Sequence, residues 1–166
     1  MYQSVEHMLC EVFFIHNTLI MGKSNSARIE EWIASKGVSD RCTTGLNQHD
    51  LHANSAMILS RIERTLNDIE WILVNAEYGY DLSGIVDLTK YVLSKTNGLA
   101  IEESDVILEY LFTRKPSQMA IQDRFNWSKG KLYRKIDRVK RVINKLHCDC
   151  IDKLELALND LVGKNK

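Results

Sequence analysis

The chain has few prolines, few glycines, no long apolar run and no net charge. Pro116 is the only proline among 166 residues. Because proline is disfavoured inside helices, its scarcity allows helices through most of the chain. No apolar run approaches the roughly 20 residues that cross a bilayer, so we expect no membrane segment. Residues 1–22 lack the basic start of a signal peptide, which predicts a cytoplasmic protein.

The residue patterns of an enzyme are also missing. The eight glycines are scattered and form no phosphate-binding loop. The cluster His147-Cys148-Asp149-Cys150 resembles a zinc site only weakly, because structural zinc sites favour a Cys-x2-Cys spacing. On a helix, residues two apart point to different sides. We therefore expect no enzyme activity, no cofactor and no metal, and we interpret the cysteines as reduced thiols.

Apolar residues recur at three- and four-residue spacing along most of the chain, and nothing alternates as a strand would. This predicts a mostly or wholly α-helical fold. The 45% of hydrophobic residues can form one core of ordinary size. We expect helices over 3–21, 26–35, 51–77, 84–94 and 103–113, with a loop over 41–50.

Charge is strongly segregated along the sequence. Residues 114–145 hold eleven Lys or Arg against two Asp, a net charge of +9. Because the whole chain is neutral, the remainder carries −9. Many helices carry a solvated basic face with no nucleic acid nearby, but a concentration of this size favours a polyanion partner.

The same basic segment has the local signals of two helices joined by a turn. Pro116 predicts that the preceding helix ends near Arg114, because proline pushes the residue before it to extended geometry. Ser117 and Ser128 are suited to cap the starts of the two helices. Asn126 lies where a turn residue is needed, because asparagine tolerates the left-handed conformation.

The second of these helices has one apolar stripe and a basic remainder. The stripe predicts a helix from Ser128 that either continues as one unusually long helix or breaks near 147–150. A short helix, a tight turn and a basic helix are typical of a helix-turn-helix whose second helix enters the DNA major groove. The stripe consists of Leu132, Ile136, Val139, Val142, Ile143 and Leu146.

The string IQDRFNWSKGKLYRKIDRVKRVI resembles the helix-turn-helix of region four of bacterial sigma factors. One position departs from that family, because its small alanine is Gln122 here. The matching positions are Ile121, Phe125, Asn126, Trp127, Ser128, Gly130, Leu132, Ile136 and Arg138.

A second resemblance covers more of the chain. RIEEWIASKG at 28–37 and the segment 52–80 are similar to the early and central helices of phage late-gene antitermination proteins of the Q class. Those proteins end in a module like sigma region four. Residues 81–115 look like an insertion relative to compact members. The resemblance implies a protein that binds DNA near a late promoter and loads onto paused RNA polymerase to suppress pausing and termination.

The resemblance suggests roles for the basic segment. We expect Lys129, Lys131, Tyr133 and Arg134 to face base edges. Ser128, at the start of the basic helix, is also expected to contact DNA. Trp127 is expected to staple the turn rather than to touch the DNA backbone. The residues expected to hold phosphates are Lys115, Lys135, Arg138 and Arg141.

These expectations divide the chain into an acidic helical part (1–113), a basic helix-turn-helix (114–146) and a C-terminal extension and tail (147–166). The apolar half of the last helix would pack back on the N-terminal helices or pair with another copy. Two other functions remain open. A sigma-like factor or activator would use the same motif at initiation, and a protein-interaction module would use the basic helix without DNA.

Overall fold

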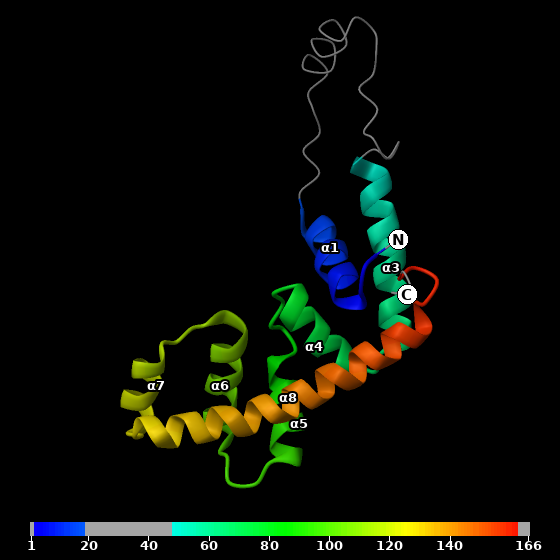
Figure 1. Cartoon of the computed structure of the whole chain (residues 1–166). Helices are drawn as coiled ribbons and strands as arrows, with labels where there is room; N and C mark the ends of the chain where they lie inside the picture. The colour runs from blue at the N-terminus through cyan, green and yellow to red at the C-terminus, as the bar shows by residue number, and fades with distance from the viewer. Residues whose placement is uncertain (1, 19–47, 163–166) are drawn as a thin grey trace, which may run out of the picture.

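The computed structural model describes residues 2–18 and 48–162, which form seven α-helices and no strand (Figure 1). The chain is therefore all-helical over this part, as the sequence predicts. The expected helix over 26–35 and residues 41–47 of the expected loop over 41–50 lie outside the described residues. Residues 48–50 of that loop are instead helical, because α3 begins at Gln48. The helices are α1 (Val5–Asn17), α3 (Gln48–Thr65), α4 (Asp68–Tyr78), α5 (Ile85–Lys95), α6 (Ile101–Thr113), α7 (Gln118–Phe125) and α8 (Lys129–Ala157).

Helix α8 is the axis of the molecule. It runs for 29 residues and packs against each of the other six described helices. In Figure 1 it crosses the molecule from α7 at one end to α3 at the other. Of the two expectations, the single long helix is confirmed, so the expected division at residue 146 falls inside a helix. Its buried stripe is Leu132, Ile136, Val139, Ile143, Leu146, Cys150 and Leu154.

The prediction of one helix over 51–77 is wrong. The structure has two helices there, α3 and α4, separated at Leu66 and Asn67. Asn67 accepts a hydrogen bond from the Glu70 N–H, and the Glu70 carboxylate accepts one from the Asn67 N–H. This reciprocal capping box starts a new helix inside an unbroken apolar pattern. Because α4 then changes direction, its buried face can meet both α1 and α8.

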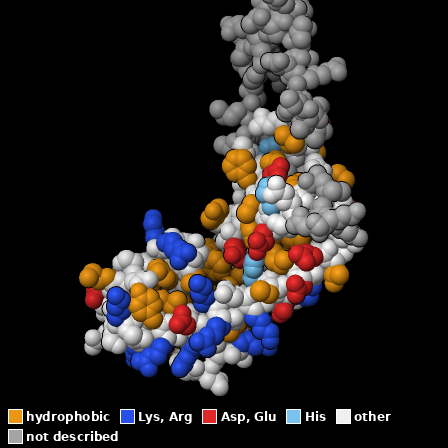
Figure 2. Space-filling view, in the orientation of Figure 1, with side chains coloured by type: hydrophobic (Ala, Val, Ile, Leu, Met, Phe, Trp, Pro, Cys, Tyr) orange, Lys and Arg blue, Asp and Glu red, His pale blue; other side chains and the backbone are white. Residues whose placement is uncertain are grey.

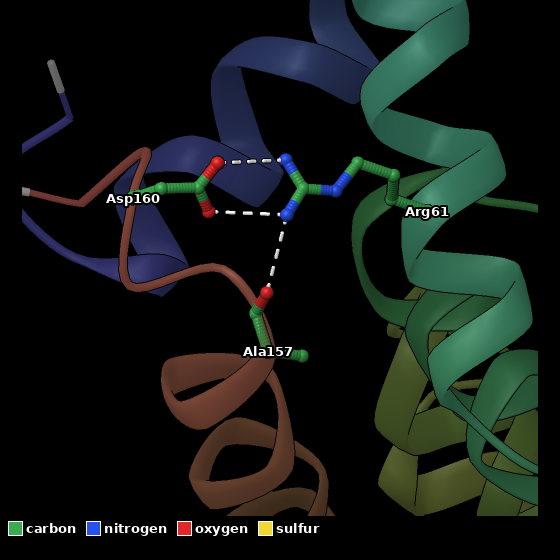
Figure 3. A network of polar contacts seen from close by, with 3 residues as sticks. All are labelled: Arg61, Ala157 and Asp160. Carbon is green, nitrogen blue, oxygen red and sulfur yellow. Dashed lines mark hydrogen bonds and ion pairs between the residues drawn. The ribbon is translucent and has the colours of Figure 1, made fainter.

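Polar contacts fix the C-terminal half of α8 to the N-terminal helices. The Arg61 guanidinium on α3 donates to both Asp160 carboxylate oxygens at 3.0 Å and to the Ala157 carbonyl (Figure 3). The Lys153 ammonium pairs with Glu70, which is buried on α4. The Tyr2 N–H donates to the Leu161 carbonyl at 3.0 Å. This half of α8 therefore packs back on the N-terminal helices, which is one of the two expected arrangements.

Toward the other end, α5, α6 and α7 pack against α8, which leaves one side of its N-terminal half exposed. Helix α5 packs closely against α6, and the turn between them contains Gly98 at φ +81°. That value lies in a region that glycine adopts without steric cost. Among the described residues, no helix is both long and apolar enough to cross a membrane.

Candidate nucleic-acid interface

The junction between α6 and α7 follows the local signals in the sequence. Helix α6 ends at Thr113, and Arg114 takes the left-handed conformation at φ +62°. Ser117 then caps α7 by accepting a hydrogen bond from the Ala120 N–H at 3.3 Å. The predictions for Pro116 and Ser117 are confirmed. The basic residues Arg114 and Lys115 are consequently exposed on a short connection rather than on a helix.

The turn from α7 to α8 also forms as predicted. Asn126 has φ +50°, in the left-handed region, and the Trp127 N–H donates to the Gln122 carbonyl at 2.9 Å. Ser128 accepts a hydrogen bond from the Lys131 N–H at 3.4 Å and caps α8. This geometry fixes the first turn of α8, which carries Lys129 and Lys131, relative to α7.

Trp127 secures this turn from inside, as expected. Its side chain is 7% exposed, and its ring stacks on Phe125 with 4.7 Å between centroids. The ammonium groups of Lys131 and Lys135 lie 5.6 Å and 4.5 Å from the Trp127 ring centroid. A cation near an aromatic face is stabilised by the ring quadrupole. Trp127 thus helps to position Lys131 and Lys135, two of the predicted site residues.

Two glutamines on α7, Gln118 and Gln122, form hydrogen bonds where α7 meets α6 and α8. Gln122, at the position of the family's alanine, is half-buried and donates to the Gln118 carbonyl. The Gln118 amide donates to the Tyr110 hydroxyl on α6 at 2.5 Å and accepts from the Tyr133 hydroxyl on α8 at 3.2 Å. The predicted base-contacting Tyr133 is therefore tied to α7 through its hydroxyl, while 42% of the residue stays exposed.

Four predicted residues converge on one hollow. Lys131, Arg134, Lys135 and Arg138 line it from α8, and Gly98 closes it from the α5–α6 turn. None of the lining residues is acidic. Among the described residues, Lys131, Arg134 and Arg138 form no ion pair. Three cations without an ion-pair partner at one concave place produce a positive potential that attracts an anion.

Lys135 differs from the other three. Its side chain is only 13% exposed, and its ammonium pairs with the Glu103 carboxylate at the start of α6. Burial raises the pKa of Glu103, but hydrogen bonds from Lys135 and the Ala100 N–H, with the nearby positive charges, outweigh it and hold the pKa below its usual value. The cation expected to grip a phosphate is already engaged by a carboxylate, so it fixes α8 against α6.

The remaining predicted residues lie around this hollow. Lys129 stands 5.9 Å from the Tyr133 ring centroid. Ser128, Lys115 and Arg141 are exposed, but the structure does not bring Lys115 or Arg141 into the hollow. Figure 2 shows Lys and Arg side chains gathered over this end of the molecule and most Asp and Glu side chains toward the other.

Sequence reasoning missed three residues of this end. Gly98 is not among the predicted site residues, and no sequence signal connects it with α8, more than thirty residues later in the chain. Lys140, with Arg114, lines a second hollow between α6 and α8 that also includes His147. Arg114 and Lys140 lie in the basic segment 114–146, so their charge could have placed them among the predicted site residues.

The His147–Cys150 cluster is arranged for packing. His147 Nε2 lies 3.0 Å from the Tyr78 hydroxyl and 3.5 Å from the Glu77 carboxylate. Cys150 is buried, and burial raises the pKa of its thiol to about 12, which keeps it protonated. Cys148 is exposed on another side of α8. The described residues hold no group of three or more His, Cys, Asp or Glu placed to bind a metal ion.

A scan of the whole chain against protein-family models finds no match, and no curated protein matches it either.

Proposed function

We propose that this protein is a sequence-specific DNA-binding transcription regulator, of the type of phage Q-class antiterminators, that acts on bacterial RNA polymerase in the host cytoplasm. The single observation that carries the DNA-binding part is the hollow in which Lys131, Arg134 and Arg138 converge without a carboxylate partner. Phosphate contacts supply much of the affinity of such an interface. The polymerase part rests on the sequence resemblance.

In this proposal α8 lies in the major groove with its N-terminal half. Arg134 and Lys131 reach base edges, together with Lys129 and Tyr133, which lie next to each other. Arg138, beside the α5–α6 turn, and Arg141 and Lys115 hold phosphates. Lys135, through Glu103, holds α8 at its angle to α6. Enzymatic activity has no place in this proposal.

Duplex binding is the first test. A labelled duplex carrying the binding element is titrated by fluorescence anisotropy at several salt concentrations. If about five to seven phosphates are contacted, the log–log salt slope should be roughly −5 to −6. Absence of duplex binding at low salt would leave the protein-interaction module as the better description.

Single variants separate base from phosphate contacts. Arg134→Ala should relax the sequence preference, because a base contact is worth about 1–3 kcal/mol of discrimination. Arg138→Ala should weaken all sequences about equally, because a phosphate contact carries no sequence information directly. Equal loss of specific and non-specific binding in both variants would contradict this division of roles.

Terminator readthrough tests the regulatory part. Purified polymerase transcribes a template with the binding element and a downstream terminator. Added protein should raise readthrough, and the increase should vanish with a scrambled element or with the double variant Lys131→Ala/Arg134→Ala. A protein that raises initiation while leaving termination unchanged would instead be the sigma-like or activator alternative.

A further inference from the structure

A second concave surface lies at the other end of the molecule, between α1 and the end of α4. Six of its lining residues are Cys10, Phe13, Phe14, Thr18, Tyr78 and Tyr80. Asn17, which also lines it, donates its amide to the Gly79 carbonyl at 3.3 Å and ties the two sides together. We call this surface the aromatic groove. It shares no residue with the basic hollow.

Two aromatic side chains of the groove are displayed to solvent. Phe14 is 72% exposed and Tyr80 is 82% exposed. Tyr80 also has φ +56°, a left-handed conformation that is unusual for a bulky residue. Such backbone conformations persist where the surrounding structure enforces them, and they concentrate at functional sites. Here the turn is enforced, because the N–H groups of Gly79 and Asp81 both donate to the Asn75 carbonyl.

Among the described elements that form the groove, carboxylates outnumber basic side chains. Helices α1 and α4 and the segment 79–84 contain no Lys or Arg. Glu77 lines the groove itself. Burial raises the pKa of Glu77, the neighbouring His147 opposes this rise, and the nearby Glu6 carboxylate adds to it. The exposed carboxylates of these elements are those of Glu6, Glu11, Asp68, Glu77 and Asp81.

We propose that the aromatic groove is the surface through which this protein holds RNA polymerase, by receiving an apolar polymerase side chain that is flanked by Lys or Arg. The proposal rests on the proposed function for the identity of the partner. Charge complementarity selects the chemistry, because an acidic rim attracts a basic segment and repels nucleic acid. Exposed aromatic side chains are the residues that most often dominate protein interfaces.

The position of the groove also allows both partners to bind at once. The groove is formed by α1 and α4, whereas the basic hollow is formed by the α5–α6 turn and the start of α8. DNA held at one end would leave the aromatic groove free. A regulator that is loaded from a DNA element onto polymerase needs two such surfaces.

The test uses the full chain and purified bacterial core RNA polymerase, without DNA. The variants are Phe14→Ala and Tyr80→Asn, since asparagine tolerates the left-handed conformation. Each should weaken polymerase binding by about tenfold or more, because truncation of a central aromatic anchor has effects of this size. Duplex binding and the melting temperature should stay unchanged, because both side chains are exposed and distant from the hollow.

Met119→Ala and Leu156→Ala are the matched controls. Both side chains are as exposed as those of Phe14 and Tyr80, but they lie on α7 and α8 outside the groove. Neither control should change polymerase binding. Wild-type protein that binds polymerase, together with groove variants that bind as tightly as the controls, would overturn the inference and leave the proposed function intact.

The acidic rim is tested by Glu6→Gln, with Glu102→Gln on α6 as its control. Glu6→Gln should weaken polymerase binding about two- to fivefold, and less at high salt, because surface charge pairs are weak and screened. Equal effects of the two variants would overturn the basic character of the bound segment.

Two further outcomes would overturn the inference. If wild-type protein does not bind core polymerase at all, the groove has no such occupant, and the polymerase part of the proposed function fails with it. If light scattering instead shows a dimer that Phe14→Ala dissociates, while polymerase binding is unaffected, the occupant is a second copy of this chain.

Discussion

The two ends of α8 have opposite surfaces on one continuous helix. At the N-terminal end it exposes Lys131, Arg134 and Arg138, which form no ion pair among the described residues. At the C-terminal end Lys153 is paired with Glu70, and the surrounding helices α1 and α4 carry carboxylates and no Lys or Arg. A helix of this length can therefore belong to one core while it presents two surfaces suited to different partners.

The comparison also separates cations that stabilise the fold from cations that are free to bind. Lys135 and Arg61 are each held by a carboxylate from a different helix or segment. Lys131, Arg134 and Arg138 have no such partner among the described residues. Counting positive charges along the sequence includes both kinds, whereas only the second kind is available to a phosphate.

The largest expected effect comes from removing the free cations. The triple variant Lys131→Ala/Arg134→Ala/Arg138→Ala should weaken duplex binding roughly 100- to 1000-fold near 0.1 M salt and reduce the salt slope by about 1, because only Arg138 of the three is assigned to a phosphate. Anisotropy titrations measure both. The control Arg64→Ala/Lys90→Ala removes cations from α3 and α5 and should have little effect. If the triple variant and the control lost similar duplex affinity, the two ends of α8 would not differ in DNA binding.

Aromatic residues at the two ends should respond differently to truncation. Trp127→Ala should lower the free energy of unfolding by about 3 kcal/mol, because it removes a large buried side chain. Tyr80→Asn should change it by less than about 0.5 kcal/mol, because the Tyr80 side chain is exposed. Urea unfolding followed by circular dichroism gives both values. A costly Tyr80→Asn would mean that the groove is structural.

The Glu103–Lys135 pair should contribute less, and in a pH-dependent way. Glu103→Gln keeps the hydrogen bond from the Ala100 N–H but should cost about 1–2 kcal/mol, because Lys135 loses its partner. Since folding lowers the pKa of Glu103, its contribution is present above the usual value of 4.5 and is lost as the pH falls through the folded value.

Unfolding of the wild type and of Glu103→Gln, compared between pH 7 and pH 3, checks this sign. The difference in unfolding free energy between them should shrink as the solution is acidified. A difference that is constant with pH would show that the loss comes from packing and not from charge.

The smallest effect compares two asparagines at helix ends, Asn126 after the end of α7 and Asn67 at the start of α4. Asn126 is left-handed at φ +50°, whereas Asn67 is extended at φ −80° and caps α4. Asn126→Ser should cost about 1 kcal/mol, because serine tolerates the left-handed region less well. Asn67→Ser should be nearly neutral, because serine caps as well as asparagine. Thermal melting of both variants, with Asn126→Gly as a neutral control, tests the difference.

The sequence by itself determined the local structure of the basic end. Pro116, Ser117, Asn126 and Ser128 place the helix ends correctly, because capping and turn preferences involve neighbours within about four residues. The apolar stripe of α8 likewise predicted its buried face, since a helix repeats every 3.6 residues. The all-helical class followed from the same periodicity.

Other features could be read only weakly from periodicity. The break between α3 and α4 lies inside a continuous apolar pattern, because the capping box at Asn67 and Glu70 is a local signal that the stripe conceals. DNA binding by the residues around Gly98 stays a prediction, and so does binding to RNA polymerase. The spacing of apolar residues carries no information about a partner.

Only the tertiary structure decided which residues meet. Packing of α6 on α8 pairs Glu103 with Lys135, 32 positions apart, and so separates one cation from the three that remain free. Packing of α1 against α4 brings Phe14 beside Tyr80 to form the aromatic groove. The physical reason is common to both: local preferences fix each helix, but the choice of neighbours depends on burying all the apolar stripes together.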